Sequence, residues 1–225
     1  MTTTLILVRH GQTDSNVRGL LHGWTDVPLT ERGILQARLV ATRLAREGGI
    51  AALYTSPLER ARHTAELIGA ALGHQPVHHP GLMEIHFGLV EGLTFAEVRE
   101  RHPELELGGD EEDAARDLFW PEGESRAAFR QRVRTTLRDL LDRHQGEKIV
   151  VTAHGGVISV GVGEFLGEPG AGWRRYMVAN CAVTQLEWDE ADDPPRVACL
   201  DDRDHLVDLP PADTVGIYER GDGEE

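Results

Sequence analysis

The chain has 225 residues, of which 40% are hydrophobic and 27% are charged, and its formal net charge is −15. This length is enough for one large α/β domain with a buried core. The strong negative charge argues against nucleic acids and anionic membranes as partners. No apolar run reaches the roughly 18 residues that a membrane-spanning helix needs.

The N-terminus and the cysteines predict where the protein resides. Residues 1–4 have neither the basic start nor the apolar core of a secretory signal. Cys181 and Cys199 are too few for a disulfide framework, and the sequence leaves open whether they pair. We therefore expect a cytoplasmic protein.

Strands and helices alternate in the first part of the chain. Residues 4–8 are β-branched and leucine-rich and predict a buried strand, whereas the polar, glycine-containing residues 11–28 predict a loop. Thr30 is expected to cap an amphipathic helix that ends at a glycine pair. Residues 50–55 predict a second short strand.

The run Ser56-Pro57-Leu58-Glu59 is the strongest local signal in the chain. Ser56 as N-cap, Pro57 as the first helical residue and Glu59 as the third predict a capping box. The helix is expected to continue to about residue 72. Arg60 then lies in its first turn, beside backbone N–H groups that attract an anion.

The second half of the chain predicts further elements. In chain order they are an extended or turning segment at residues 81–92, helical turns at 94–101, an acidic mobile loop at 107–113, a long helix from Ser125, a buried strand at 148–153, a helix at 155–165, and edge strands at 183–188 and 196–200.

This alternation predicts a three-layer α/β/α sandwich with a mostly parallel central sheet. We expect one catalytic domain over residues 1–208, with a lid or substrate-specificity insertion at about residues 85–125. Residues 209–225 are expected to form a loose acidic tail.

Two histidines each follow a predicted buried strand. His10 stands between Arg9 and Gly11 after the first strand, and His154 stands before Gly155 after the strand at 148–153. Because strand ends in an open α/β sheet face the ligand crevice, the two histidines can meet although about 140 residues separate them. With arginines beside them, they predict a site that holds a phosphoryl group and attacks it.

Four ordered sequence blocks resemble the histidine phosphatase superfamily, in its phosphoglycerate-mutase-like branch. Residues 7–16, LVRHGQTDSN, closely resemble the family signature. Residues 55–65 are similar to its second arginine block, residues 82–88 with the following Glu91-Gly92 to its acid block, and residues 150–156 to its second histidine block. Four blocks in order are far more specific than one Arg-His-Gly, and the resemblance spans roughly residues 4–200.

The resemblance implies a phosphohistidine mechanism. His10 attacks phosphorus through one ring nitrogen, while a nearby backbone carbonyl accepts the hydrogen of the other. A phosphate monoester carries nearly two negative charges, so Arg9, Arg60 and a donor from His154 are expected to neutralise its oxygens. Because arginines supply this charge, we expect neither a metal ion nor a cofactor.

The resemblance also assigns an acid and two contacts. Glu84 is expected to protonate the leaving oxygen and then to deprotonate water, with a pKa raised by burial. Glu91, seven positions further on, is the rival for this role. Asn16 and Gly155 are expected to contact the substrate.

Two other groups of residues allow a second interpretation. His74, His78 and His79 could suggest a metal site, but they lack helical spacing, and we interpret them as a solvated loop. Phe119 and Trp120 either rest against the leaving group or anchor the lid in the core.

The sequence therefore predicts a metal-independent phosphomonoesterase for a small phosphorylated metabolite. A phosphoglycerate-type acid, a sugar phosphate and α-ribazole phosphate all fit. Phosphoglycerate mutases carry a lysine near the position of Phe95, and the acidic residues between 104 and 124 disfavour polyanions. A phosphoglycerate mutase is the alternative, and a non-catalytic phosphate-binding scaffold is the alternative of another class. Because such proteins are commonly dimers, the resemblance also allows a homodimer.

Overall fold

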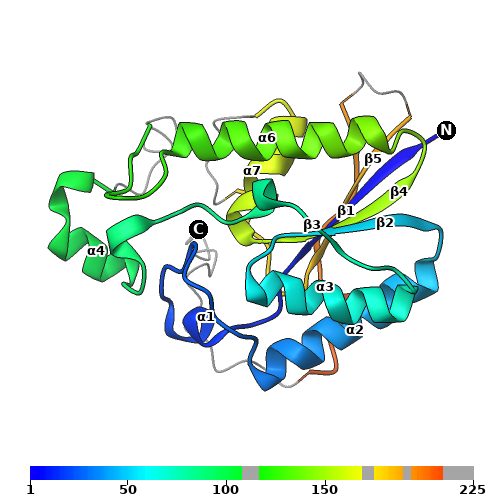
Figure 1. Ribbon diagram of the computed structural model, residues 1–225, viewed down its shortest axis with the longest axis horizontal. Coiled ribbons are helices and arrows are strands. Elements are labelled where there is room, and N and C mark those ends of the chain that lie inside the picture. The colour runs from blue at the N-terminus through cyan, green and yellow to red at the C-terminus, as the bar shows by residue number, and fades with distance from the viewer. Residues whose placement is uncertain (108–116, 169–174, 190–193, 210–225) are drawn as a thin grey trace, which may run out of the picture.

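A central β-sheet organises the molecule (Figure 1). The computed structural model describes residues 1–107, 117–168, 175–189 and 194–209, and in these residues six strands lie in the order β3-β2-β4-β1-β5-β6. Neighbours among β1 to β4 pair in parallel, and β5 is antiparallel to both of its neighbours. The bounds are β1 (Thr3–Arg9), β2 (Ile50–Thr55), β3 (Val77–His78), β4 (Lys148–Ala153), β5 (Val183–Trp188) and β6 (Arg196–Asp202).

Helices cover both faces of this sheet. α2 (Glu31–Glu47) and α3 (Glu59–Leu72) lie on one face, whereas α6 (Arg126–Arg143) and α7 (Gly155–Phe165) lie on the other (Figure 1). The predicted three-layer α/β/α sandwich is therefore confirmed. In the described parts of the chain, no helix combines the length and the apolar character needed to cross a membrane.

Short α-helices and 3₁₀ turns accompany these longer elements. The α-helices among them are α1 (Asp14–Arg18) and α4 (Phe95–Arg101), and the 3₁₀ turns are η1 (Pro80–Leu82), η2 (Gly88–Val90), η3 (Pro103–Leu105) and η4 (Asp204–Leu206). α4 is the helical turn expected after Thr94, whose side chain forms a capping box with Glu97.

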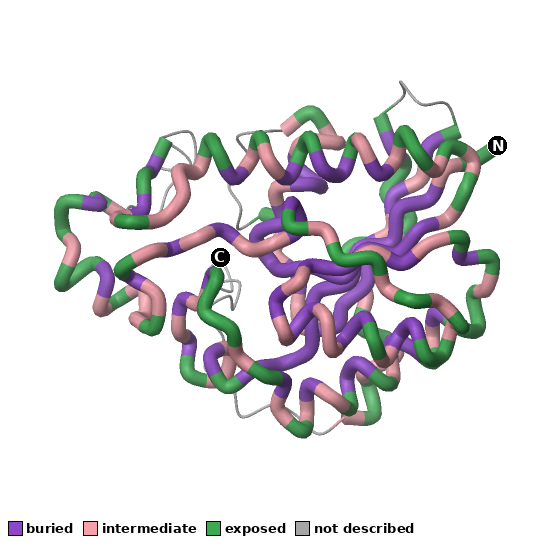
Figure 2. Tube along the Cα trace, in the orientation of Figure 1, coloured by how far each residue is buried: buried purple, intermediate pink, exposed green. Residues whose placement is uncertain are grey.

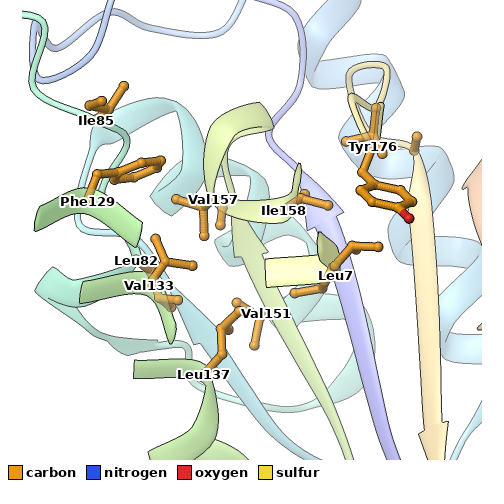
Figure 3. Packing of buried hydrophobic residues seen from close by; sticks show 14 of the residues in the cluster. Leu7, Leu82, Ile85, Phe129, Val133, Leu137, Val151, Val157, Ile158 and Tyr176 are labelled. Atoms are coloured by element: carbon orange, nitrogen blue, oxygen red, sulfur yellow. The ribbon is translucent and has the colours of Figure 1, made fainter. Parts of the chain in front are cut away.

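The side chains of β1 alternate between two cores. Leu5 and Leu7 belong to the cluster beneath α6 and α7, where Figure 3 shows Leu7 on the same side of the sheet as Leu137 of α6. Ile6 and Val8 belong to the cluster beneath α2. Successive residues of a strand point to opposite faces, so β1 is buried on both sides and runs through the buried centre of the molecule (Figure 2).

The start of α3 differs from the prediction. The helix begins at Glu59, and its N-cap residue Leu58 makes no side-chain cap. Asp26 supplies the cap from another loop, because its carboxylate accepts a hydrogen bond from Glu59 N at 2.7 Å. The Ser56 hydroxyl bonds His154 and Leu58 N and makes no cap with Glu59 N. The predicted capping box is wrong because these long-range partners replace the local ones.

Two further expectations need correction. Residues 11–28 are not only loop, since they contain α1, which Thr13 caps by accepting a hydrogen bond from Asn16 N. β5 is not an edge strand, because it pairs with β1 on one side and with β6 on the other. The helices expected after Thr30 and Ser125 begin where their caps predict.

The expected lid and tail fall partly outside the described residues. Positions 108–113 of the acidic loop and 210–225 of the tail lie outside the described residues. The described part of the insertion buries Leu118 and Trp120 in the cluster beneath α6 and α7. The division into a domain, a lid and a tail stays a prediction.

Candidate active site

The register of β1 and β4 brings the two histidines together. Arg9 pairs with Ala153 at the ends of these parallel strands, and His10 N donates a hydrogen bond to Ala153 O at 2.9 Å. The next residue of each strand is then a histidine. The ring centroids of His10 and His154 lie 5.2 Å apart, and both residues are buried. Residues far apart in sequence thus meet at one edge of the sheet.

His10 is held as a neutral imidazole. Its Nδ1 lies 2.7 Å from the carbonyl oxygen of Gly11, so Nδ1 carries the hydrogen and Nε2 keeps its lone pair. Burial lowers the pKa of His10 well below its ordinary value, and the positive charges of Arg60 and Arg9 lower it further. Gly11 must be glycine here, because a Cβ would lie 2.4 Å from the carbonyl oxygen of Gly33. The ring therefore offers a nucleophilic nitrogen.

His154 is oriented by Ser56. The hydroxyl of Ser56 lies 2.8 Å from His154 Nε2 and also accepts a hydrogen bond from Leu58 N. The serine hydroxyl can donate to Nε2, and in that arrangement the imidazole hydrogen is on Nδ1. In the described structure His154 Nδ1 is buried and has no hydrogen-bond partner. Burial lowers the pKa of His154 well below its ordinary value, with Arg60 as the next cause.

Arg60 is a buried cation rather than a surface residue of α3. Its guanidinium donates to the carbonyl oxygens of His22, Gly23 and Thr25. Among the described residues, no carboxylate oxygen lies within 4 Å of it. Burial lowers the pKa of Arg60 to about 10, so it is still charged at neutral pH. The backbone of residues 22–25 thus holds a positive charge close to His10.

Arg9 and Gly155 lie together on another side of the site. Arg9 is buried, and its Nη1 donates to the carbonyl oxygen of Val178 at 2.6 Å. A Cβ on Gly155 would lie 3.7 Å from Arg9 Cζ. We call His10, His154, Arg9 and Arg60 the basic cluster. All of its side chains are buried, and such a concentration of positive charge attracts an anion.

Asn16 is linked to the backbone of His10 through Asn180. Its Oδ1 accepts hydrogen bonds from Thr13 N and Oγ1 and from Asn180 Nδ2 at 3.1 Å. Asn180 Nδ2 also donates to the carbonyl oxygen of His10 at 3.0 Å. Because Oδ1 of Asn16 is engaged in this network, its Nδ2 is the part of the amide that can contact a substrate.

Glu84 and Glu91 have different surroundings. The Glu84 carboxylate accepts hydrogen bonds from Gly156 N and Ile85 N, each at 3.0 Å. It therefore lies against the first turn of α7, two residues after His154. Burial raises the pKa of Glu84, although both N–H groups and Arg60 oppose this effect. A proton is thus held more readily on this carboxyl than on an exposed one.

Glu91 acts as a brace for the loop that holds Arg60. Its carboxylate accepts hydrogen bonds from the backbone N–H groups of Trp24, Thr25 and Phe87 and from the Thr25 hydroxyl. These donors occupy both oxygens of the carboxylate. The Glu84 carboxylate thus lies at the first turn of α7, whereas the Glu91 carboxylate is held among backbone donors away from that helix.

No pattern in the sequence points to His22, which also lies at the site. Its ring meets the ring of His10 edge-on, with 6.1 Å between centroids. Its Nδ1 lies 3.1 Å from the carbonyl oxygen of Leu20. Burial lowers the pKa of His22 to about 3, with the charge of Arg60 as the second cause. The sequence does not predict Asn180 as a site residue either, because neither Asn180 nor His22 belongs to a periodic pattern.

The aromatic residues of the insertion have separate roles. Trp120 is buried and packs edge-on against Phe87, which supports its interpretation as a core anchor. Phe119 is 65% exposed.

Within the described ranges, no three histidine, cysteine, aspartate or glutamate side chains are grouped as metal ligands. Cys181 and Cys199 are both free thiols.

Comparisons with known proteins agree with this geometry. The profile of the histidine phosphatase superfamily (branch 1) matches residues 5–200. A protein of Serratia proteamaculans named "Probable phosphoglycerate mutase GpmB" is 33% identical over 190 residues, which cover 82% of this chain and 85% of the relative.

Solved structures are similar over most of the chain. A mycobacterial glucosyl-3-phosphoglycerate phosphatase has a TM-score of 0.77 and 28% identity, covering 89% of this chain and 99% of its own. The α-ribazole phosphatase of Shigella flexneri has a TM-score of 0.77 and 28% identity, covering 88% and 96%. The profile match covers residues 5–200, which is most of the chain, and the chain therefore belongs to the histidine phosphatase superfamily, branch 1.

Proposed function

We propose that the protein is a metal-independent phosphomonoesterase that hydrolyses a small phosphorylated metabolite through a phosphohistidine on His10. The observation that carries this proposal is the hydrogen bond from His10 Nδ1 to the Gly11 carbonyl in a ring kept neutral by burial. It leaves Nε2 as a nucleophile at the centre of the basic cluster. Superfamily members act as phosphatases or mutases, and both begin with this attack.

In the first step, Nε2 of His10 forms a bond to phosphorus while the bond from phosphorus to the ester oxygen breaks. Arg9, Arg60 and the Nδ1–H of His154 stabilise the charge on the phosphoryl oxygens. Glu84 gives its proton to the departing alkoxide, which its raised pKa favours. The two arginines supply the positive charge that a metal ion supplies in other phosphatases.

In the second step, a water molecule attacks the phosphohistidine. The new bond joins the water oxygen to phosphorus, the bond from phosphorus to His10 Nε2 breaks, and Glu84 takes the proton from water. Inorganic phosphate leaves, and both residues return to their starting states. A mutase differs at this point, because the phosphoryl group returns to a substrate hydroxyl instead of going to water.

Several features favour water as the acceptor. The compared structures are named as phosphatases, for glucosyl-3-phosphoglycerate and α-ribazole phosphate. Phe95, near the position where mutases carry a lysine, packs against the core cluster beneath α6 and α7. The name of the Serratia relative supports the mutase as the alternative. We propose a small monophosphate rather than nucleic acid or membrane as the ligand, because the net charge is −15. We also propose a cytoplasmic location, which the two free cysteines support.

The experiment is hydrolysis of p-nitrophenyl phosphate with and without a metal chelator, followed by a panel of natural monophosphates assayed for phosphate release. We expect turnover that the chelator does not reduce. Loss of turnover with the chelator would contradict the metal-independent mechanism. A folded protein with no turnover on any monoester would instead indicate a phosphate-binding scaffold.

A second assay separates the phosphatase from the mutase. The enzyme is given 3-phosphoglycerate with and without bisphosphoglycerate, and 2-phosphoglycerate and free phosphate are both measured. We expect free phosphate as the main product if this substrate is accepted at all. Efficient isomerisation that depends on bisphosphoglycerate would establish the mutase instead.

A further inference from the structure

Glu84 lies in a part of the chain that regular secondary structure does not hold. We call residues 81–86 the acid segment. It includes the last two residues of η1 and ends before η2, and Glu84 lies in the irregular part between them. No sheet ladder passes through this segment, so the backbone of Glu84 is not fixed in the way that β1 and β4 fix the histidines. Yet a proton donor has to be held close to the leaving oxygen. Other residues must therefore supply the support.

Arg132 of α6 supplies much of it. Its Nη1 donates to the carbonyl oxygens of Gly81 at 3.1 Å and Met83 at 2.8 Å, and its Nη2 donates to the carbonyl oxygen of Glu84 at 3.3 Å. Nε and Nη2 also bond the two carboxylate oxygens of Glu124, at 3.0 and 2.7 Å. A guanidinium has five N–H donors, and each of them has an acceptor here.

Glu124 fixes the orientation of this guanidinium. Its carboxylate binds Arg132 in the two-point geometry that orients an arginine best. Its own backbone N–H donates to the carbonyl oxygen of His86 at 2.8 Å. Gly123 lets this contact form, because a Cβ there would lie 2.3 Å from the same oxygen. The turn at residues 123–124 and α6 thus hold the acid segment together.

The opposite side of Glu84 is also held. Trp24 Nε1 donates to the Glu84 carbonyl oxygen at 2.9 Å, and the Trp24 ring packs against His86 with 4.6 Å between centroids. The carbonyl of Glu84 therefore accepts one hydrogen bond from Arg132 and one from the loop that binds Arg60. These two bonds restrict rotation of the residue about its backbone.

We propose that Arg132, held by Glu124, is a positioning residue that sets where Glu84 delivers its proton. Neither residue touches the reacting atoms, so both act through Glu84. This inference rests on the proposed function, in which Glu84 protonates the leaving oxygen. Its consequence is specific: loosening Arg132 harms esters whose leaving group needs a proton and spares those whose leaving group does not.

The test is Arg132→Lys, which keeps the positive charge and loses the planar five-donor fork. We expect kcat/KM, which reports the steps up to phosphoenzyme formation and not the attack of water, to fall about 10- to 100-fold for an alkyl phosphate, the range in which a displacement of about 1 Å acts. We expect kcat/KM for p-nitrophenyl phosphate to change by about twofold at most, because nitrophenolate leaves without a proton. Arg138→Lys, an exposed arginine of the same helix, is the matched control and should alter neither rate.

Two further variants keep this test decisive. Glu124→Gln retains the size of the side chain and weakens its bond to Arg132. We therefore expect a smaller loss of activity than in Arg132→Lys, again on alkyl phosphates and not on p-nitrophenyl phosphate. If Arg132→Lys does not fold, Glu124→Gln carries the test. Arg132→Lys combined with Glu84→Gln should lose no more alkyl phosphate activity than Glu84→Gln alone, since the two changes disable one function.

The outcomes separate this inference from the proposed function. Equal losses on both esters in a folded Arg132→Lys protein would overturn the positioning role, as would unchanged alkyl phosphate hydrolysis. Additive losses in the double variant would overturn it too. Failure of the unmodified enzyme to hydrolyse any monoester would refute the proposed function itself.

Discussion

The basic cluster and the acid segment are built in different ways. His10 and His154 stand one residue beyond two paired strands, and the register of Arg9 opposite Ala153 fixes both. Main-chain hydrogen bonds and buried strands position them. Glu84 belongs to a segment without such a ladder, and side-chain bonds from Arg132 and Trp24 position it.

This difference teaches which part of the site tolerates change. The groups that hold a phosphoryl group are set by the most buried part of the fold, where movement is costly. The group that handles the proton is set by a few polar contacts between separate elements. We therefore expect damage at the basic cluster to stop the reaction for every substrate, and damage at the acid segment to depend on the leaving group.

His10→Ala should have the largest effect. Removing the nucleophile should reduce turnover of every phosphate ester by about 10⁴-fold or more and abolish the phosphoenzyme. Rapid alkaline quenching with labelled substrate, followed by detection of phosphohistidine, measures it, because the bond from phosphorus to nitrogen survives alkali and not acid. His78→Ala, at an exposed position of β3, is the control. A labelled phosphoenzyme in folded His10→Ala would mean that another residue is the nucleophile.

Glu84→Gln should have the next largest effect, and an uneven one. We expect kcat/KM, which reports phosphoenzyme formation, to fall about 10²- to 10³-fold for alkyl phosphates and only a few-fold for p-nitrophenyl phosphate, because loss of a proton donor penalises poor leaving groups. The kcat values of both esters should fall, because Glu84 also takes the proton from water in the second step. Glu91→Gln should show no such dependence, since Glu91 braces residues 24 and 25. Leaving-group dependence in Glu91→Gln, but not in Glu84→Gln, would transfer the acid role to Glu91.

Gly156→Ala should imitate a milder loss of Glu84. A Cβ at this position would lie 2.4 Å from Glu84 Oε1, so the carboxylate must move. We expect kcat/KM to fall about tenfold on alkyl phosphates with little change on aryl phosphates, within the range for misplaced catalytic groups. Gly163→Ala, two turns along the same helix, is the control for crowding alone, because its Cβ would meet the carbonyl oxygen of Glu168 at 3.1 Å and not Glu84. Steady-state kinetics on both esters measures the difference.

Acid should weaken the fold by a smaller amount through the histidines. Burial lowers the pKa of His10, His22 and His154, so below pH of about 6.5 the unfolded chain takes up protons that the folded chain refuses. Stability is then complete above that pH and falls as pH drops, by up to about 1.4 kcal/mol per histidine and pH unit. Glu84, whose pKa is raised by burial, acts in the opposite direction as a single group.

Thermal unfolding between pH 7.5 and 5.5 measures this effect, and we expect Tm to fall by several degrees. Inorganic phosphate should reduce the fall, because an anion in the basic cluster favours protonated histidines. His22→Gln should show a shallower pH dependence than the unmodified chain. A Tm that stays constant or rises on acidification would show that the three imidazoles are not held neutral in the folded state.

The sequence alone determined the order of elements and the residues of the basic cluster. Local patterns carry this information: the apolar runs before His10 and His154 predict buried strands, and the caps at Thr30 and Ser125 predict where helices begin. Parallel strands also end at a common edge, so convergence of the histidines followed from the fold class. Resemblance to the family, rather than any local signal, favours Glu84 over Glu91.

Only the tertiary structure decided which partners each polar group has. Ser56 has the pattern of a helix cap, but it bonds His154, which is 98 residues away. The ring of His22 packs against that of His10. Arg132 bonds the carbonyl oxygen of Glu84, which is 48 residues away in the sequence. The physical reason is that a buried polar group needs a hydrogen-bond partner and takes whichever one packing brings near. Sequence periodicity reports which face is buried, and it contains no record of such pairings.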